Sequence, residues 1–191
     1  MWRTIDWDKM EDQLLRTQQR LARAAYSRDF EAVIALQKQI VRSLPAKVLA
    51  VRHVVQINSE AGVDGVRWKS DAEKMRAALS LTSRGYHAKP YRRIIVTERG
   101  KERRIHIPVA YDKAMQVLYA YSLDPVAEST ADRKSFAFRK GRSMFDAHAY
   151  ICAAFEGDNA PDWVVRADVK ACYDSISHKW LLEHIPMDAK V

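Results

Sequence analysis

The sequence has few cysteines, no long apolar run and no internal repeat. Its 191 residues include two cysteines, Cys152 and Cys172, too few for a disulfide scaffold or a four-ligand zinc site. No apolar stretch approaches the roughly 18 residues of a membrane-spanning helix, and the start, Met1–Asp8, lacks the apolar segment of a signal peptide. These absences argue against a secreted or membrane-spanning protein and predict a cytoplasmic one.

Basic residues outnumber acidic ones. Lys and Arg total 32 against 24 Asp and Glu, so the formal net charge is +8 at pH 7. An excess of this size favours a polyanionic partner such as a nucleic acid, although charge also serves solubility. The position of the cations along the chain is therefore more informative than their number.

The first part of the chain is predicted to be helical. Apolar residues recur at three- and four-residue steps over residues 8–28 and 30–43, which predicts two helices joined as a hairpin. Asp71 is expected to cap a later helix over 72–83. Further helices are predicted over 46–57, 111–124, 144–156 and 177–185. The polar face of the first two helices is rich in hydrogen-bond donors: Arg16, Gln18, Gln19, Arg20, Arg23, Lys38 and Arg42.

A cationic β-hairpin is predicted over residues 91–107, with its turn at Glu98–Lys101. Strand alternation places Lys101 and Arg103 on one face and Arg104 on the other. Such cations either contact a phosphate chain or a triphosphate, or protect an edge hairpin in solvent. The cations of this segment are Lys89, Arg92, Arg93, Arg99, Lys101, Arg103 and Arg104.

A second basic cluster contains aromatic residues. Phe136 and Phe138 are interleaved with cations, and aromatic and guanidinium groups together favour stacking on bases and binding of phosphates. The alternative is that both rings lie in the core with the cations around them. The cations are Arg133, Lys134, Arg139, Lys140 and Arg142.

An apolar strand is predicted over residues 164–169, followed by a turn into a helix. It ends near Asp168, and a carboxylate at such a position can bind Mg²⁺. A metal pair usually needs another carboxylate from a second strand. The alternative is that Asp168 caps the helix that follows.

Five segments, in order along the chain, resemble the group II intron-encoded reverse transcriptases, also called maturases. The resemblance implies an α+β fold with three parts: a helical amino-terminal extension over 1–57, fingers with a β-hairpin over 58–160, and the first strand and helix of an incomplete palm over 161–191. The segments are Trp2–Trp7 with the helices after it, Ala50–Asn58 with Ala61–Gly65, Lys89–Arg93 with Lys101–Pro108, Ser135–Ser143 (similar to SYGFRPGRS), and Arg166–Asp174 (similar to DIK.CFD.I).

The resemblance also implies roles for single residues. Asp168 matches the first metal-binding aspartate, so it is expected to be catalytic and to bind Mg²⁺ in the complete enzyme. Tyr173 matches the aromatic residue that crowds the sugar 2′ position and favours deoxynucleotides. The residues expected to bind the nucleotide with Tyr173 are Lys101, Arg103, Arg139 and Arg142. The residues expected to bind RNA are Arg16, Arg20, Arg23, Lys89, Arg92 and Arg93.

The sequence departs from the family pattern in places. Arg104 and Lys140 stand where proline is usual, and His106 and Ala137 where glycine is usual. The second palm motif, Tyr-Ala-Asp-Asp, does not occur in the 191 residues. The chain is therefore expected to bind intron or template RNA and a primer–template duplex, and not to polymerise deoxynucleotides alone.

Several alternatives to this interpretation stay open. The chain could be a stand-alone RNA-binding module of maturase type, part of a reverse transcriptase of bacterial defence or CRISPR spacer acquisition, or an inactive reading frame. An incomplete palm would expose apolar surface. Either a homodimer or assembly with a separate palm-bearing chain is therefore expected.

Overall fold

The computed structural model describes residues 2–58, 60–98, 100–157 and 160–187. These residues form two compact units, one comprising residues up to 129 together with Met187, and the other comprising residues 130–186. Arg99 of the predicted hairpin turn and the last four residues of the predicted palm lie outside the described ranges. Within those ranges, no helix has the length and apolar character needed to span a bilayer.

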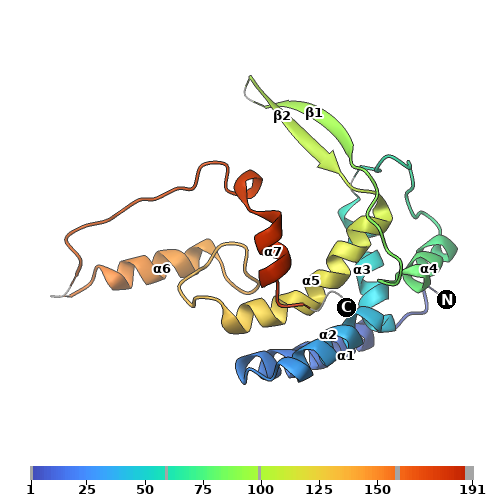
Figure 1. The fold of residues 1–191 in the computed structure, drawn as a ribbon, viewed down its shortest axis with the longest axis horizontal. Helices are drawn as coiled ribbons and strands as arrows, with labels where there is room; N and C mark the ends of the chain where they lie inside the picture. Colours follow the sequence, from blue (N-terminus) through green and yellow to red (C-terminus); the bar gives the residue numbers. More distant parts are fainter. Residues whose placement is uncertain (1, 59, 99, 158–159, 188–191) are drawn as a thin grey trace. The chain divides into compact units, whose positions relative to one another are not determined.

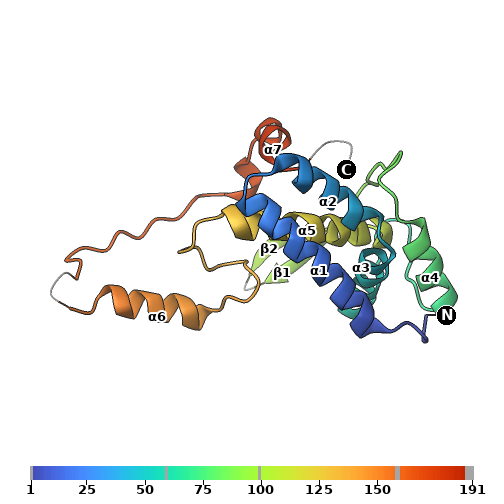
Figure 2. The ribbon, with the colours of Figure 1, turned by 90° about the horizontal axis from the view of Figure 1, so that it is seen from below.

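Two antiparallel helices begin the first unit, and they lie side by side in both views (Figures 1 and 2). α1 spans Trp7–Tyr26 and α2 spans Phe30–Arg42. Each is capped by an aspartate, Asp6 or Asp29, whose side chain accepts the backbone N–H three residues later at 3.0 Å. The predicted helical hairpin is confirmed.

The next two helices are α3, Leu44–Ile57, and α4, Asp71–Ser80. Ser70, and not Asp71, caps α4. The Ser70 side chain accepts from the Glu73 backbone N–H at 3.2 Å, and the Glu73 carboxylate accepts from the Ser70 N–H at 2.8 Å. This reciprocal pair satisfies two backbone donors at once, which is why the helix begins at Asp71. The predicted cap and the predicted extension to residue 83 are wrong.

Helix α5 spans Ala110–Thr130 and continues through Pro125, beyond its predicted end at residue 124. Proline has no N–H, so the Tyr121 carbonyl, four residues earlier, loses its usual helical donor. The Gln18 side chain of α1 donates to that carbonyl at 2.8 Å. The hydrogen bond that proline removes is thus replaced from α1, and the helix continues.

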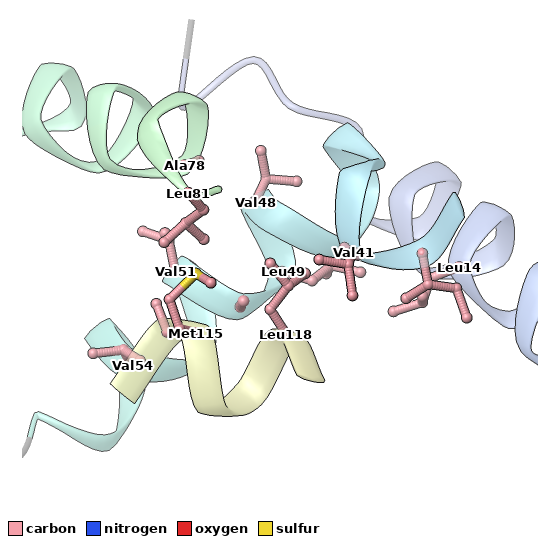
Figure 3. Close-up of a cluster of buried hydrophobic side chains, with 14 of the residues drawn as sticks. Leu14, Val41, Val48, Leu49, Val51, Val54, Ala78, Leu81, Met115 and Leu118 are labelled. Carbon is pink, nitrogen blue, oxygen red and sulfur yellow. The ribbon is translucent and has the colours of Figure 1, made fainter. Parts of the chain in front are cut away.

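The hydrophobic core of the first unit forms around α3 (Figure 3). α3 buries side chains along its length because it contacts α1, α2 and α4. Met115 and Leu118 of α5 and Leu81 after α4 are fully buried in the same cluster. Burial of each such side chain contributes about 1.5–3 kcal/mol, so this helical core is the main source of stability in the unit.

The sheet of the first unit is a two-stranded antiparallel hairpin, which makes the fold α+β as predicted. β1 spans Arg92–Glu98 and β2 spans Lys101–Ile107, with Arg92 opposite Ile107 and Glu98 opposite Lys101. The hairpin projects from the helices in Figure 1, and each of its residues except Ile94 and Ile107 is exposed. Both faces of the ribbon are therefore open to solvent.

The second unit contains α6, Met144–Ala154, a 3₁₀ turn at Tyr173–Ser175, and α7, His178–His184. Across residues 130–157 and 160–186 no hydrophobic side chain is buried. The predicted strand over 164–169 is wrong, because this segment is irregular and exposed. A strand must pair its backbone N–H and C=O groups with a neighbouring strand, and the described part of this unit contains none.

Candidate nucleic-acid interface

The two faces of the hairpin both carry cations. Residues opposite each other in an antiparallel pair project on the same face. The register therefore puts Lys101 and Arg103 on one face and Arg93 and Arg104 on the other. Arg103 Nη1 lies 3.9 Å from a Glu98 carboxylate oxygen, and both side chains are largely exposed. An exposed pair at this distance is weak, so Arg103 can exchange Glu98 for a phosphate at little cost.

The base of the hairpin is attached to the loop before α4. Arg92 Nη1 donates to the Ala61 carbonyl at 3.2 Å. Lys89 Nζ lies 3.6 Å from an Asp64 carboxylate oxygen. Lys89 and Arg92, which were expected to bind RNA, therefore also hold the hairpin on this loop, while about half of each side chain stays exposed.

The same loop packs tightly on the start of α5. A Cβ atom at Gly62 would lie 2.6 Å from Val109 Cα, so only glycine fits there. Lys113 Nζ donates to the Glu60 carbonyl at 2.6 Å, and burial, followed by the charge of Arg67, lowers the pKa of Lys113. These contacts hold the loop before α4 against the start of α5, and that loop in turn contacts the base of the hairpin.

Asp112 connects the start of α5 to the segment before the hairpin, a role that sequence reasoning missed. Its side chain is buried in the first turn of α5. One carboxylate oxygen accepts from the Tyr86 hydroxyl and the other from the Lys89 backbone N–H, each at 2.9 Å. An acidic residue in the first turn of a helix is common, so the sequence alone did not distinguish Asp112.

The Tyr86–Asp112 bond predicts a pH dependence of stability. Burial, followed by the hydrogen bond to Asp112 and its charge, raises the pKa of Tyr86 above the ordinary 10.0. Above that pH the unfolded chain loses the proton that the native state keeps. The contribution of Tyr86 is therefore complete below pH 10 and is lost as the pH rises toward the native pKa.

Tyr86→Phe removes this titration. Urea unfolding at pH about 9 and about 11 should show a smaller loss of unfolding free energy in the variant than in the wild type. Comparing the two proteins cancels the titration of other tyrosines and lysines. An identical loss in both would contradict a raised pKa at Tyr86.

Three of the predicted RNA-binding cations share one face of α1. Arg16, Arg20 and Arg23 are exposed, and their spacing of four and three residues places them on one side of the helix. Arg16 pairs with Asp12 at 2.7 Å, one turn earlier on the surface. The buried face of α1 lies on the opposite side, at Leu14, Leu21 and Ala25.

In the second unit, two arginines hold the basic loop together. Arg139 Nη1 donates to the Asp132 carbonyl at 2.6 Å. Arg142 Nη1 donates to the Ser135 carbonyl at 2.6 Å and to the Arg133 carbonyl at 2.8 Å. A guanidinium has five N–H donors, so holding the loop does not prevent the predicted contact with a nucleotide.

The loop ends in a second reciprocal cap. The Asp146 carboxylate accepts from the Ser143 backbone N–H at 2.7 Å and from its hydroxyl at 2.6 Å, at the start of α6. The hydroxyl contact and then the backbone contact lower the pKa of Asp146. Gly141, just before the cap, has a φ of +71°, which glycine adopts without strain.

The two phenylalanines of this loop occupy different environments. The Phe136 ring lies 5.8 Å from the Tyr150 ring and 6.0 Å from the Arg142 guanidinium. Phe138 is 97% exposed and has a φ of +58°. Neither lies in a core, so the alternative of two core rings is wrong.

Asp168 and Tyr173 lie in the exposed part of the second unit. Tyr173 begins the 3₁₀ turn and is 76% exposed. Where the structure describes the chain, no three His, Cys, Asp or Glu side chains lie close enough to hold a metal ion. Magnesium binding needs several oxygen ligands, and the role of Asp168 as one of them stays a prediction.

The predicted residues thus fall into separate groups. Lys101 and Arg103 share the hairpin face, and Arg16, Arg20 and Arg23 share the α1 face; both groups belong to the first unit. Arg139 and Arg142 share the basic loop of the second unit. Asp168 and Tyr173 belong to the same unit but lie outside that loop. Strand alternation and helical spacing were sufficient to find the first two groups. The arginine–carbonyl bonds of the loop leave no comparable pattern in the sequence.

Two family profiles match the chain. Residues 2–81 match the N-terminal domain of reverse transcriptase. Residues 87–187 match the family described as reverse transcriptase (RNA-dependent DNA polymerase). The second match covers more than half of the 191 residues.

Individual proteins are similar over shorter stretches. The chain is 31% identical over 121 residues to the group II intron-encoded protein LtrA of Lactococcus lactis subsp. cremoris, covering 62% of this chain and 20% of LtrA. It is 34% identical over 104 residues to an uncharacterized 91 kDa protein in the cob intron of Schizosaccharomyces pombe, covering 54% and 12%. It is 29% identical over 139 residues to maturase-like protein 1 of Euglena gracilis, covering 70% and 30%. The chain therefore spans less than a third of each relative.

Proposed function

The chain belongs to the reverse transcriptase family, in the group II intron type, and from that premise we propose that its cationic surfaces bind RNA. The observation that carries this proposal is the hairpin, a ribbon exposed on both faces with Lys101 and Arg103 together on one of them. A two-stranded ribbon is marginally stable by itself. A polyanion that neutralises these cations releases counterions and thereby gains affinity.

A second contact is proposed for the face of α1 that carries Arg16, Arg20 and Arg23. These side chains extend over about two helical turns, or roughly 10 Å, which is long enough to contact more than one phosphate of a strand. Because the apolar side of α1 is buried against the core, the cationic side is the one available to a ligand. We propose that residues 1–57 act as the RNA-binding extension and residues 58–160 as the fingers.

Nucleotide-binding roles are proposed for the complete enzyme. Lys101, Arg103, Arg139 and Arg142 would meet the phosphates of an incoming deoxynucleotide, and Tyr173 would lie against its sugar. The support is the position of these residues in the motifs of a family to which the chain belongs. The charge of each cation suits a triphosphate, and an aromatic ring at Tyr173 suits exclusion of a 2′-hydroxyl.

Asp168, within the proposed palm segment 161–191, is proposed as one carboxylate ligand of Mg²⁺. Magnesium, when bound, would neutralise phosphate charge during nucleotidyl transfer. A single carboxylate does not hold a metal pair, so these 191 residues alone are expected not to extend a primer. Robust Mg²⁺-dependent primer extension on an RNA template by this chain would contradict that part of the proposal.

Titration of RNA binding against salt tests the proposed function. The logarithm of the association constant should fall linearly with the logarithm of the KCl concentration, by about 0.7–0.9 for each phosphate contact. Absence of binding at low salt, or binding that does not depend on salt, would contradict it. Deoxynucleotide binding in a parallel titration favours part of a polymerase, whereas RNA binding without it favours an RNA-binding module.

A further inference from the structure

We propose that Phe138 is a stacking site for an unpaired nucleobase, an inference that rests on the RNA binding proposed above. The ring is 97% exposed and lies in the middle of the basic loop of the second unit. None of the contacts that organise this loop uses the ring: the loop is held by arginine–carbonyl bonds and by the Ser143–Asp146 cap. The ring is therefore available to a ligand.

The backbone at Phe138 adopts a conformation that most side chains avoid. Its φ of +58° is in the left-handed region, where a Cβ atom crowds the following carbonyl group. Asn and Asp tolerate this region because their side chains bond locally, but phenylalanine has no such compensation. Strain of this kind persists only where the surroundings enforce it, and it is concentrated at ligand sites.

The loop around Phe138 is held by two arginines that follow it in the sequence. Arg139 bonds the Asp132 carbonyl and Arg142 bonds the Ser135 carbonyl, each at 2.6 Å. Gly141 provides a second left-handed residue between them. A ring presented by a loop tied at both ends loses less conformational freedom on binding than a ring on a loose loop.

The charge around the ring selects the class of ligand. Residues 132–143 contain five cations and one acid, Asp132. An aromatic ring among cations suits a ligand that has both a π-face and negative charge, and a nucleotide in single-stranded RNA has both. The base would stack on Phe138 while its phosphates meet the cations. A purely apolar partner would gain nothing from the cations.

Phe136 supplies the internal contrast. Its ring packs beside Tyr150 at 5.8 Å and near the Arg142 guanidinium at 6.0 Å, so we assign it to the structure of the loop. The two phenylalanines are two residues apart, and both lie among the same basic residues of the sequence. Of these two rings, Phe138 is therefore the one to which stacking on a base is assigned.

The test compares two single-stranded ligands of equal length and charge, an oligouridylate and an abasic ribose–phosphate oligomer. Phe138→Ala should weaken oligouridylate binding by roughly 5- to 150-fold, the range for loss of one stacked base. Binding of the abasic oligomer should stay within about twofold, because the phosphate contacts are unchanged. Phe138→Trp should retain the affinity of the wild type for oligouridylate.

Phe138→Gly distinguishes the contribution of the ring from that of the backbone conformation. Glycine keeps the left-handed conformation without strain, so this variant should preserve the melting temperature and should lose the same base-dependent affinity as Phe138→Ala. If Phe138→Gly binds oligouridylate as tightly as the wild type, the loss in Phe138→Ala comes from backbone strain and not from the missing ring. That result would overturn the proposal.

Two further outcomes are distinct. A wild-type chain that binds both oligomers equally, or a Phe138→Ala chain that loses affinity for both equally, would overturn stacking and leave RNA binding intact. A wild-type chain that binds neither oligomer would contradict RNA binding itself, and the stacking site with it.

Discussion

Replacing Asp112 with alanine is expected to lower the free energy of unfolding by about 3–6 kcal/mol, since two hydrogen bonds to a charged group contribute roughly 1.5–3 kcal/mol each. The residue is 2% exposed, and its carboxylate accepts from the Tyr86 hydroxyl and the Lys89 N–H. Alanine would leave both donors without an acceptor in a partly buried place. A loss of this size is a large fraction of the stability of an ordinary domain.

Asp8 provides the matched control for this variant. It also lies in the first turn of a helix, α1, but it is exposed. Asp8→Ala should cost only the interaction with the helix dipole, about 0.3–1 kcal/mol. Urea unfolding of both variants, followed by far-UV circular dichroism, measures the difference. If the free energies of unfolding of Asp112→Ala and Asp8→Ala agree within about 1 kcal/mol, the two hydrogen bonds of Asp112 do not stabilise the attachment of the hairpin.

Charge reversal at the hairpin is expected to have the largest effect on RNA binding. The double variant Lys101→Glu/Arg103→Glu removes the two proposed phosphate contacts and adds two repulsive charges on one face. Its affinity for RNA at moderate salt should fall on the order of 100-fold. The slope of the logarithm of the association constant against the logarithm of the salt concentration should become shallower by about 1.4–1.8. Anisotropy titrations at several salt concentrations measure both quantities.

The control for this variant changes the net charge by the same amount elsewhere. Arg76 on α4 and Arg84 after it are exposed and lie outside the hairpin and the α1 face. Arg76→Glu/Arg84→Glu should weaken binding by less than about threefold, through the overall field alone. Equal losses in the two double variants would mean that net charge, and not the hairpin, determines binding.

Local signals predicted much of the fold. The periodicities of α1 and α2 are contained within short segments, and the hairpin follows from alternation on both sides of its turn. The start of α4 was also readable, because Ser70-x-x-Glu73 is a capping-box pattern. The single-residue pattern that favours Asp71 as the cap leaves out this reciprocal partner.

The features that sequence reasoning missed depend on distant partners. The continuation of α5 through Pro125 depends on Gln18, which lies 103 residues from the carbonyl it bonds. The apolar segment 164–169 has the composition of a strand, yet a strand exists only where a neighbour completes its hydrogen bonds. Composition also could not separate Phe136 from Phe138, since contacts with Tyr150 and Arg142 decide which ring packs.

Photochemical cross-linking of the 191-residue chain to RNA, followed by mass spectrometry of the linked peptides, tests the central claim most directly. Cross-links should be concentrated in the hairpin, residues 92–107, on the Arg16–Arg23 side of α1, and at Phe138. They should decline together as salt is raised. Cross-links confined to α4, or an absence of any in the hairpin under conditions where RNA is bound, would contradict the assignment of the cationic ribbon as the RNA-binding element.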